Sequence, residues 1–282
     1  MDHSGLRPSG GDPVVEAKRL LRLSGPPRGF FFDFDGVLAP IGEDPEAVQP
    51  PPAVLTVLRR LARLADRVAI VSARPVSFLS ERLPEVPGVA LFGLYGLEAK
   101  HADGELVTDP AAEGWAAVVG ELTERARAEL PPPTRVEYKR LSVALHYRKA
   151  PELRAVVEEW AARVAAQTGL RPQHGRMVVE LMPPVARHKG TVVDEETEGL
   201  RSAWYFGDDV SDLDGFAALQ RRAAQVPGFQ GVRIAVTNPE TGDPLRDVAD
   251  LVLDSPQAVP ELLSTLVTEL EMSSATGPGA VP

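Results

Sequence analysis

Apolar residues in this chain fall in short continuous runs of strand length, which alternate with longer helical stretches. The apolar runs are 29–35 (GFFFDFD), 67–73 (RVAIVSA), 88–96 (GVALFGLYG), 202–209 (SAWYFGDD) and 231–236 (GVRIAV). Helical stretches separate them, among them 51–65 and 212–223. Strands that are buried on both faces lose the alternation of polar and apolar residues, and helices join parallel strands. The order therefore predicts an α/β fold whose parallel sheet is covered on both faces.

The middle of the chain has a different rhythm. Its order is helix, two strands, helix, two strands, over 111–130, 134–140, 141–148, 151–168, 169–175 and 176–183. Helices followed by paired strands are typical of a small α+β domain. We therefore predict that this domain is inserted into the larger one, with joints near Asp103 and near Pro183-Pro184.

The predicted division of the chain follows from these two patterns. It comprises a disordered or helical N-terminal segment at 1–28, a doubly wound core formed by 29–103 and 184–270, an inserted domain at 104–183, and a disordered tail at 271–282. Residues 14–23 (VVEAKRLLRL) are an amphipathic segment in the first of these parts, and we expect a packing helix there. The Gly, Pro and Ser content at both ends favours disorder.

Composition narrows the classes of protein. Of 282 residues, 44% are hydrophobic and 25% are charged, as in ordinary globular proteins. Cysteine is absent, which excludes disulfides, cysteine nucleophiles and thiolate metal sites. A net charge of −10 argues against nucleic acid or an anionic membrane as the main partner. With no signal-peptide pattern and no run of membrane-spanning length, we expect a soluble cytoplasmic protein.

Polar residues gather where the predicted core strands end. The residues at these ends are Asp33, Asp35, Ser72, Arg74, Asp208, Asp209 and Asp212. In an open parallel sheet, ligands bind beyond the carboxyl ends of the strands. Converging carboxylates repel one another strongly at protein dielectric values, and a hard divalent cation relieves this repulsion. Because the candidate ligands are all oxygens, Mg²⁺ fits best, and it also accepts a phosphate oxygen of a substrate.

The spacing of these residues favours phosphoryl transfer. Asp33 is placed to attack phosphorus and form an aspartyl-phosphate. Asp35 is placed to protonate the leaving alcohol and later to activate water, and Gly36 lets the chain turn after it. Lys189, at the expected start of a helix, is the best cation for the charge on the phosphoryl group. Ser72 supplies a hydrogen bond to a phosphoryl oxygen.

The order of these motifs resembles the haloacid dehalogenase superfamily of phosphohydrolases: DxDG, a strand that ends in Ser, a Lys, then GDDxxD. More narrowly, five stretches resemble the trehalose-6-phosphate phosphatase family. They are DFDGVLAPIGEDPEAV, GLYGLEAKHADGEL, VEYKRLSVALHYR, VVELMPPVARHKG and GDDVSDLDGF. The similarity covers residues 29 to about 270. It implies a haloacid dehalogenase-like core, an inserted α+β cap of the larger (C2) type, and a Mg²⁺-dependent sugar-phosphate phosphatase.

The resemblance also implies a role for each matching residue. It makes Asp33 the nucleophile and Asp35 the acid/base, and it implies that Asp33, the Asp35 backbone carbonyl and Asp208 hold Mg²⁺. The residues that it implies around them are Ser72 and Lys189 for the phosphoryl group, Asp209 and Asp212 as support, and Glu137, Lys139 and Glu180 of the cap for the sugar. The pattern agrees for the cap, because Glu137 and Lys139 are two apart and share a strand face. We expect Arg74 to contact phosphate or sugar.

Several departures and alternatives stay open. The resembled family usually has Glu at Leu213, His at Tyr95 and Gly at Ala73. The first two lie near the expected sugar site, so another glycosyl or pseudo-disaccharide phosphate is an alternative substrate. A sugar phosphomutase and a non-enzymatic phosphoacceptor or sensor are alternative functions. Among the histidines, we expect His146 to be a cap residue with a satisfied ring, and His188 is a weak candidate for a leaving-group contact.

Overall fold

The structure is a computed structural model that describes residues 12–42, 44–84, 86–175, 177–239 and 243–275. Its larger sheet has eight strands in the order β12-β11-β10-β1-β2-β3-β4-β5. These are β1 (Arg28–Phe32), β2 (Arg67–Val71), β3 (Val89–Gly93), β4 (Glu98–Lys100), β5 (Leu106–Thr108), β10 (Ser202–Gly207), β11 (Gln230–Val236) and β12 (Leu251–Leu253). All neighbours from β12 to β3 pair in parallel. The predicted α/β fold with a parallel sheet is confirmed.

One edge of the large sheet is antiparallel, which the sequence did not predict. Strand β4 pairs antiparallel with β3, and β5 pairs antiparallel with β4. Both strands have three residues. The predicted joint near Asp103 falls between them, so the large sheet continues beyond it. The division of the chain into domains at this joint stays a prediction.

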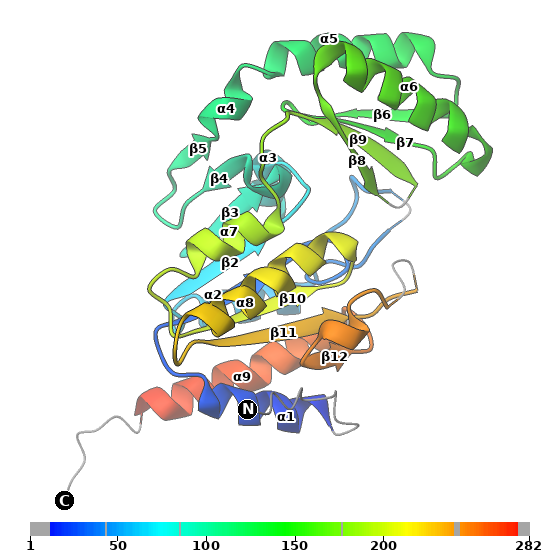
Figure 1. The fold of residues 1–282 in the computed structure, drawn as a ribbon. Coiled ribbons are helices and arrows are strands. Elements are labelled where there is room, and N and C mark those ends of the chain that lie inside the picture. The colour runs from blue at the N-terminus through cyan, green and yellow to red at the C-terminus, as the bar shows by residue number, and fades with distance from the viewer. Residues whose placement is uncertain (1–11, 43, 85, 176, 240–242, 276–282) are drawn as a thin grey trace, which may run out of the picture.

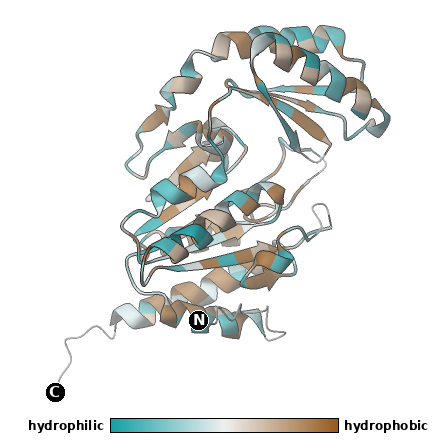
Figure 2. Cartoon of the chain, in the orientation of Figure 1, coloured by the Kyte–Doolittle hydropathy of each residue, from teal (hydrophilic) through white to brown (hydrophobic). Residues whose placement is uncertain are grey.

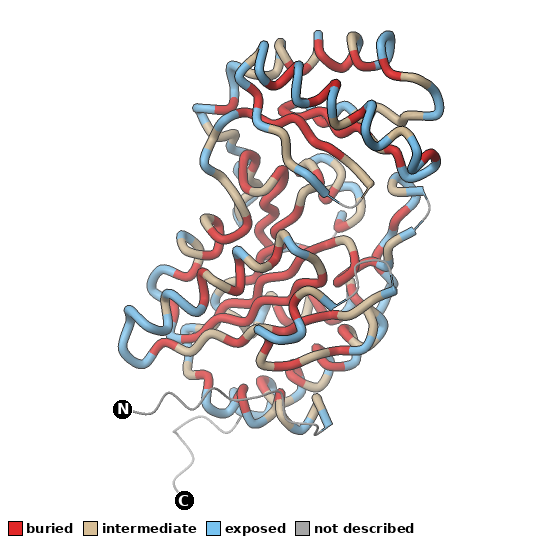
Figure 3. The backbone as a smooth tube through the Cα atoms, turned by 45° about the vertical axis from the view of Figure 1, so that its right-hand side comes forward, coloured by how far each residue is buried: buried red, intermediate tan, exposed pale blue. Residues whose placement is uncertain are grey.

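Helices cover both faces of the large sheet (Figure 1). One face packs against α1 (Pro13–Leu23), α2 (Pro52–Leu61), α3 (Val76–Arg82) and α9 (Ala258–Ala275), and the other against α7 (Lys189–Glu196) and α8 (Leu213–Gln225). The aromatic run of β1 serves both sides, because successive side chains of a strand point to opposite faces. Phe30 and Phe32 lie in the first core, and Phe31 lies in the second. Apolar colour and burial both concentrate in these central strands (Figures 2 and 3).

The first and last helices of the described chain, α1 and α9, lie side by side at the side of the large sheet away from the second sheet (Figure 1). Helix α1 confirms the packing helix expected at 14–23, and its buried residues are Ala17, Leu20 and Leu21. Helix α9 continues to Ala275, so the first residues of the predicted tail are helical. The disorder predicted for the ends concerns mainly residues 1–11 and 276–282, which lie outside the described ranges.

The second sheet has four antiparallel strands in the order β6-β7-β9-β8. Its elements and the helices around it are α4 (Pro110–Glu113), α5 (Ala116–Glu129), β6 (Arg135–Tyr138), β7 (Val143–His146), α6 (Arg154–Thr168), β8 (Arg171–Gly175) and β9 (Val178–Met182). Val143, Leu145, Val179 and Leu181 point to one face and pack with α5 and α6. The strand period of two therefore turns Glu137, His146 and Glu180 to the other face, toward the large sheet.

Short 3₁₀ turns complete the fold: Leu94–Gly96, Pro151–Leu153, Val210–Asp212 and Arg246–Val248. None of the helices in the described part of the chain combines the length and the apolar character of a membrane span.

Candidate active site

The carboxyl ends of three neighbouring strands form one site. Strand β1 lies between β10 and β2, so the residues that follow these strands are adjacent in space. The sequence-predicted residues Asp33, Asp35, Ser72, Arg74, Lys189, Asp208 and Asp209 all line one cavity there, together with Glu137, Lys139 and Glu180 of the second sheet. The structure thus brings together all the predicted site residues: Asp212 does not line the cavity, but its side chain contacts Lys189.

Lys189 lies between two carboxylates. Its Nζ is 2.7 Å from Asp33 Oδ2 and 2.7 Å from Asp212 Oδ1. All three side chains are buried, and Lys189 is 1% exposed. Lys189 is the first residue of α7, and two carboxylate oxygens compensate the burial of its ammonium.

Asp212 organises the loop after β10. Its Oδ1 also accepts a hydrogen bond from the Tyr205 hydroxyl at 2.8 Å. Its Oδ2 accepts the backbone N–H groups of Asp208 at 3.0 Å and Asp209 at 3.2 Å. Asp209 in turn accepts from the backbone N–H and the hydroxyl of Ser211. Both oxygens of Asp212 are therefore engaged with protein groups, which is the geometry of a supporting residue.

Charge in this cluster is only partly balanced. Burial raises the pKa of Asp33 well above its ordinary value, and the Lys189 ammonium offsets only part of this. Burial and then the negative charges of Asp212 and Asp209 raise the pKa of Asp208 to about 8. Burial alone would lower the pKa of Lys189, but Asp212 and Asp33 raise it well above the ordinary value. The site holds its lysine charged and disfavours two ionised carboxylates.

These carboxylates fit a divalent metal ion. One oxygen each of Asp33, Asp208 and Asp212 lie within 4.8 Å of one another. Gly36 has a φ of 80°, and a Cβ on it would lie 2.2 Å from Asp208 Oδ2, so only glycine leaves room for this carboxylate. Asp208 Oδ2 also accepts a hydrogen bond from Asn238 Nδ2 at 2.9 Å. Hard oxygen donors with excess negative charge are what Mg²⁺ and similar cations bind.

Asp35, which follows β1, is paired with Arg74, which follows β2, and both line the cavity. Arg74 Nε donates to Asp35 Oδ2 at 2.7 Å, and its Nη2 donates to Oδ1 at 2.9 Å. The guanidinium also lies 4.4 Å from the centre of the Phe78 ring. A bidentate contact of this kind fixes the plane of the carboxylate. The sequence placed both residues at the site but did not predict that they pair.

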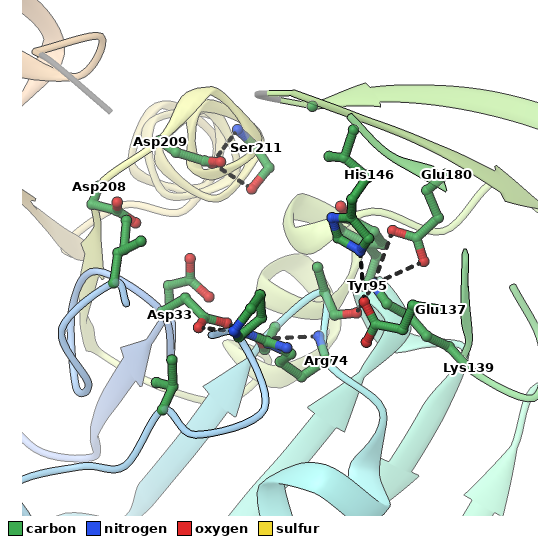
Figure 4. A pocket seen from close by; sticks show the side chains of 18 of the residues that line it. Asp33, Arg74, Tyr95, Glu137, Lys139, His146, Glu180, Asp208, Asp209 and Ser211 are labelled. Atoms are coloured by element: carbon green, nitrogen blue, oxygen red, sulfur yellow. Dashed lines mark hydrogen bonds and ion pairs between the residues drawn. The ribbon is translucent and has the colours of Figure 1, made fainter. Parts of the chain in front are cut away.

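The Ser72 loop is tied to the turn that follows β3. Ser72 is 1% exposed, and its carbonyl accepts the backbone N–H of Tyr95 at 2.9 Å. Leu94 and Tyr95 have left-handed backbones, with φ of 49° and 60°, and such conformations cost free energy in residues with a Cβ. The turn places Tyr95 in the cavity wall, between the predicted residues of the large sheet and those of the second sheet (Figure 4).

Polar residues of the second sheet form two pairs on the opposite wall. Glu137 Oε2 lies 2.8 Å from His146 Nε2, which confirms that the His146 ring is satisfied. Lys139 Nζ lies 3.2 Å from both oxygens of Glu180. Burial raises the pKa of Glu137, but the hydrogen bond with His146 and the charge of Lys139 outweigh it and lower this pKa to about 2. Hydroxyl groups of a sugar bind to such carboxylates and ammonium groups by directional hydrogen bonds.

The cavity between the two walls has a volume of about 220 Å³. Pockets that hold drug-sized ligands usually have about 300–1,000 Å³. The cavity is therefore smaller than that range. His188 does not line this cavity, and its Nδ1 lies 3.6 Å from Asp214 Oδ2.

Sequence reasoning missed two residues of this site. Asn238 follows β11, the strand next to β10, so the strand-end rule that found Asp208 also points to it. Ser142, whose hydroxyl donates to Glu180 Oε1, is buried and carries no motif that marks it.

The fold is that of haloacid dehalogenase-like proteins. A haloacid dehalogenase-like hydrolase from Bacteroides thetaiotaomicron matches with a TM-score of 0.57 at 16% identity, over 87% of this chain and 99% of that one. The Candida albicans trehalose-6-phosphate phosphatase C-terminal domain matches with a TM-score of 0.75 at 23% identity, over 95% and 99% of the two chains. At these identities, the matches show the fold.

Sequence comparison gives the family. The Trehalose-phosphatase family profile matches residues 31–244. The trehalose-phosphate phosphatase of Mycobacterium avium (strain 104) is 35% identical over 96% of this chain and 76% of that protein. The protein of the same name from Mycobacterium ulcerans (strain Agy99) is 35% identical over 88% of this chain but only 63% of its own length. The chain belongs to the trehalose-phosphatase family, and its reaction class is phosphoric monoester hydrolysis.

Proposed function

We propose that this protein is a Mg²⁺-dependent phosphatase that converts trehalose 6-phosphate to trehalose and phosphate. The observation that carries the proposal is the single cavity in which Asp33, Lys189 and Asp208 face the Glu137, Lys139 and Glu180 group. The first group suits a phosphoryl group, and the second suits a sugar. Family membership supports this pairing of chemistry with substrate.

The first step transfers the phosphoryl group to Asp33. An Asp33 oxygen bonds to phosphorus, and the bond between phosphorus and the sugar oxygen breaks. Asp35 gives its proton to the leaving sugar oxygen. Lys189, which is 2.7 Å from Asp33 Oδ2, orients the nucleophile and offsets the charge of the phosphoryl oxygens. Ser72 supplies a hydroxyl at the same end of the cavity.

The second step restores the enzyme. Asp35 takes a proton from water, whose oxygen bonds to phosphorus, and the bond from phosphorus to Asp33 breaks. Phosphate leaves, and Asp35 is again protonated for the next turnover. Asp33, Asp208 and the Asp35 backbone carbonyl would hold Mg²⁺, which when bound supplies positive charge for the phosphoryl oxygens.

The contact between Asp35 and Arg74 must change before Asp35 acts as the acid. Both Asp35 oxygens accept bonds from Arg74, so at least one bond must break before Asp35 gives a proton to the leaving oxygen. Arg74 lines the cavity and is then free to bind a phosphoryl or sugar oxygen. The role predicted for Arg74 in substrate binding is thus compatible with its position.

The test is phosphate release from a panel of esters with and without Mg²⁺. The panel comprises trehalose 6-phosphate, glucose 6-phosphate, mannose 6-phosphate, sucrose 6-phosphate and the artificial ester para-nitrophenyl phosphate. We expect Mg²⁺-dependent release with the highest kcat/KM for trehalose 6-phosphate. A higher value for another sugar phosphate would reassign the substrate, and an isomerised sugar phosphate without free phosphate would indicate a phosphomutase. The expectations of no nucleic-acid partner and a cytoplasmic location stay predictions.

A further inference from the structure

The hairpin that carries Lys139 is attached to the large sheet by a contact outside the cavity. Arg140, the next residue, donates from Nε to Glu98 Oε1 at 2.9 Å and from Nη2 to Thr108 Oγ1 at 2.7 Å. Glu98 lies in β4 and Thr108 in β5, the two antiparallel edge strands of the large sheet. Neither Arg140 nor Glu98 lines the active-site cavity. We call Arg140, Glu98 and Thr108 the clasp.

Glu98 binds to both parts of the molecule at once. The residue is 6% exposed, and its Oε2 accepts the backbone N–H of Val76 at 2.9 Å. Val76 begins α3, two residues after Arg74. One oxygen of Glu98 is thus bound to the loop that carries Arg74, and the other is bound to the second sheet. Without Arg140, this buried carboxylate would keep one neutral donor, the Val76 N–H, among the described residues, which is costly.

The backbone at Arg140 is strained in a way that the clasp explains. Arg140 has a φ of 66°, and Leu141 N–H donates to the Lys139 carbonyl at 2.8 Å, which closes a tight three-residue turn. A left-handed conformation costs free energy in a residue with a Cβ, and such strain clusters at functional sites. The turn sends the Arg140 side chain to Glu98, while Lys139 enters the cavity and donates to Glu180 and to the Ala73 carbonyl at 3.4 Å.

We propose that Arg140 and Glu98 are positioning residues, which hold Lys139 at the sugar end of the site and couple sugar binding to closure of the two sheets. This proposal rests on the proposed function, because it assigns Lys139 to the sugar. When the sheets separate, the clasp and the Lys139 contact with Ala73 break together. When they close on a sugar phosphate, both form together, so the clasp favours substrates that Lys139 recognises.

A second contact between the sheets provides a matched control. Arg135, the first residue of β6, pairs with two residues of the segment that follows β1: Glu46, whose side chain is 68% exposed, and Asp44 at 66% exposure. Ion pairs between exposed groups contribute little to stability. Arg135→Met removes an arginine that also joins the two sheets, but it leaves the turn at Lys139 intact.

The experiment measures kcat and KM for Arg140→Met, Arg140→Lys and Arg135→Met with trehalose 6-phosphate and with para-nitrophenyl phosphate. We expect Arg140→Met to raise KM for the sugar phosphate about tenfold, equal to ~1.4 kcal/mol, with kcat/KM for the artificial ester within about twofold of wild type. Arg140→Lys should recover part of the loss, and Arg135→Met should behave as wild type. Equal losses on both esters, or equal effects of Arg140→Met and Arg135→Met, would overturn the proposal.

A double-mutant cycle tests whether Arg140 acts through Glu98, and hydrogen exchange tests the clasp without any substrate. Because Arg140 acts through Glu98, adding Glu98→Gln to Arg140→Met should cost no more than Arg140→Met alone. Amide exchange at Lys139 and Leu141 should speed up in Arg140→Met and not in Arg135→Met. If wild type hydrolyses only the artificial ester, the proposed substrate is wrong, yet exchange still tests the clasp. Unchanged exchange in Arg140→Met would show that the clasp does not hold the turn.

Discussion

The two walls of the cavity differ in how their carboxylates are compensated. On the wall formed by the strand ends of the large sheet, Asp33 and Asp208 are buried and burial raises the pKa of each. On the wall formed by the second sheet, Glu137 and Glu180 each have a partner, His146 and Lys139. Excess charge on the first wall fits metal binding and phosphoryl transfer. Paired charge on the second fits recognition of a neutral polyol, so chemistry and specificity should be separable by mutation.

The largest effect is expected at the nucleophile. Asp33→Asn should lower kcat by a factor of at least about 10³ on every ester, because the proposed first step needs a carboxylate oxygen of this residue to bond to phosphorus. Its thermal midpoint without metal should be no lower than that of wild type, since burial already disfavours the ionised form of Asp33. Steady-state kinetics measures kcat, and calorimetry measures the thermal midpoint. Retained turnover in Asp33→Asn would refute the assignment.

Lys189→Met should affect both activity and stability. It leaves Asp33 and Asp212 buried with no ammonium, and breaking a buried pair in this way costs ~3–5 kcal/mol. Chemical denaturation measures the loss of stability. The double variant Lys189→Met/Asp212→Asn should recover part of it, because one unpaired charge is then absent. A fully stable Lys189→Met protein would show that the cluster is not held as described.

Recognition should fail selectively when the second wall is changed. Glu180→Gln removes the charge that pairs with Lys139, and we expect kcat/KM for trehalose 6-phosphate to fall about tenfold to a hundredfold. Hydrolysis of para-nitrophenyl phosphate should change little, since that ester has no sugar hydroxyls. Measuring kcat/KM for both esters with the same variant tests this prediction. Parallel losses would contradict the separation of the two walls.

Metal affinity should depend on pH through the first wall. The pKa of Asp208 is raised to about 8, so the metal-free protein keeps this proton up to about pH 8. Below that pH, a metal must displace the proton, and its affinity should fall as pH falls, by at most about tenfold per pH unit for one proton. Titration calorimetry with Mg²⁺ at pH 6, 7 and 8 checks this. An affinity that does not change over this range would count against Asp208 as a ligand.

The smallest effect concerns acid stability on the second wall. The pKa of Glu137 is lowered to about 2, so its ionised form stabilises the fold above the ordinary value of 4.5. This contribution is lost as pH falls from 4.5 toward 2. In Glu137→Gln, the free energy of unfolding should therefore fall by about 1–2 kcal/mol less than in wild type over that interval of pH. Denaturant midpoints at pH 3 and pH 6, compared with wild type, measure the difference.

Strand ends were predictable from the sequence, and side-chain pairs were not. The apolar runs at 29–35, 67–73 and 202–209 predicted three strands with Asp33, Ser72 and Asp208 near their ends, and the structure places these strands side by side. Strands β4, β5 and β12 have only three residues each, too few for a pattern. The pairs Asp35–Arg74 and Glu98–Arg140 join residues 39 and 42 positions apart. Such contacts depend on how loops fold back, which local sequence does not encode.

The most direct measurement asks where phosphate is held during turnover. Wild-type protein mixed with trehalose 6-phosphate and Mg²⁺, quenched with acid within milliseconds and digested, is analysed for the phosphorylated peptide by mass spectrometry. We expect the phosphoryl group on Asp33, and its absence in Asp33→Asn. Rapid turnover in which no aspartate is ever labelled, or label on an aspartate other than Asp33, would contradict the account.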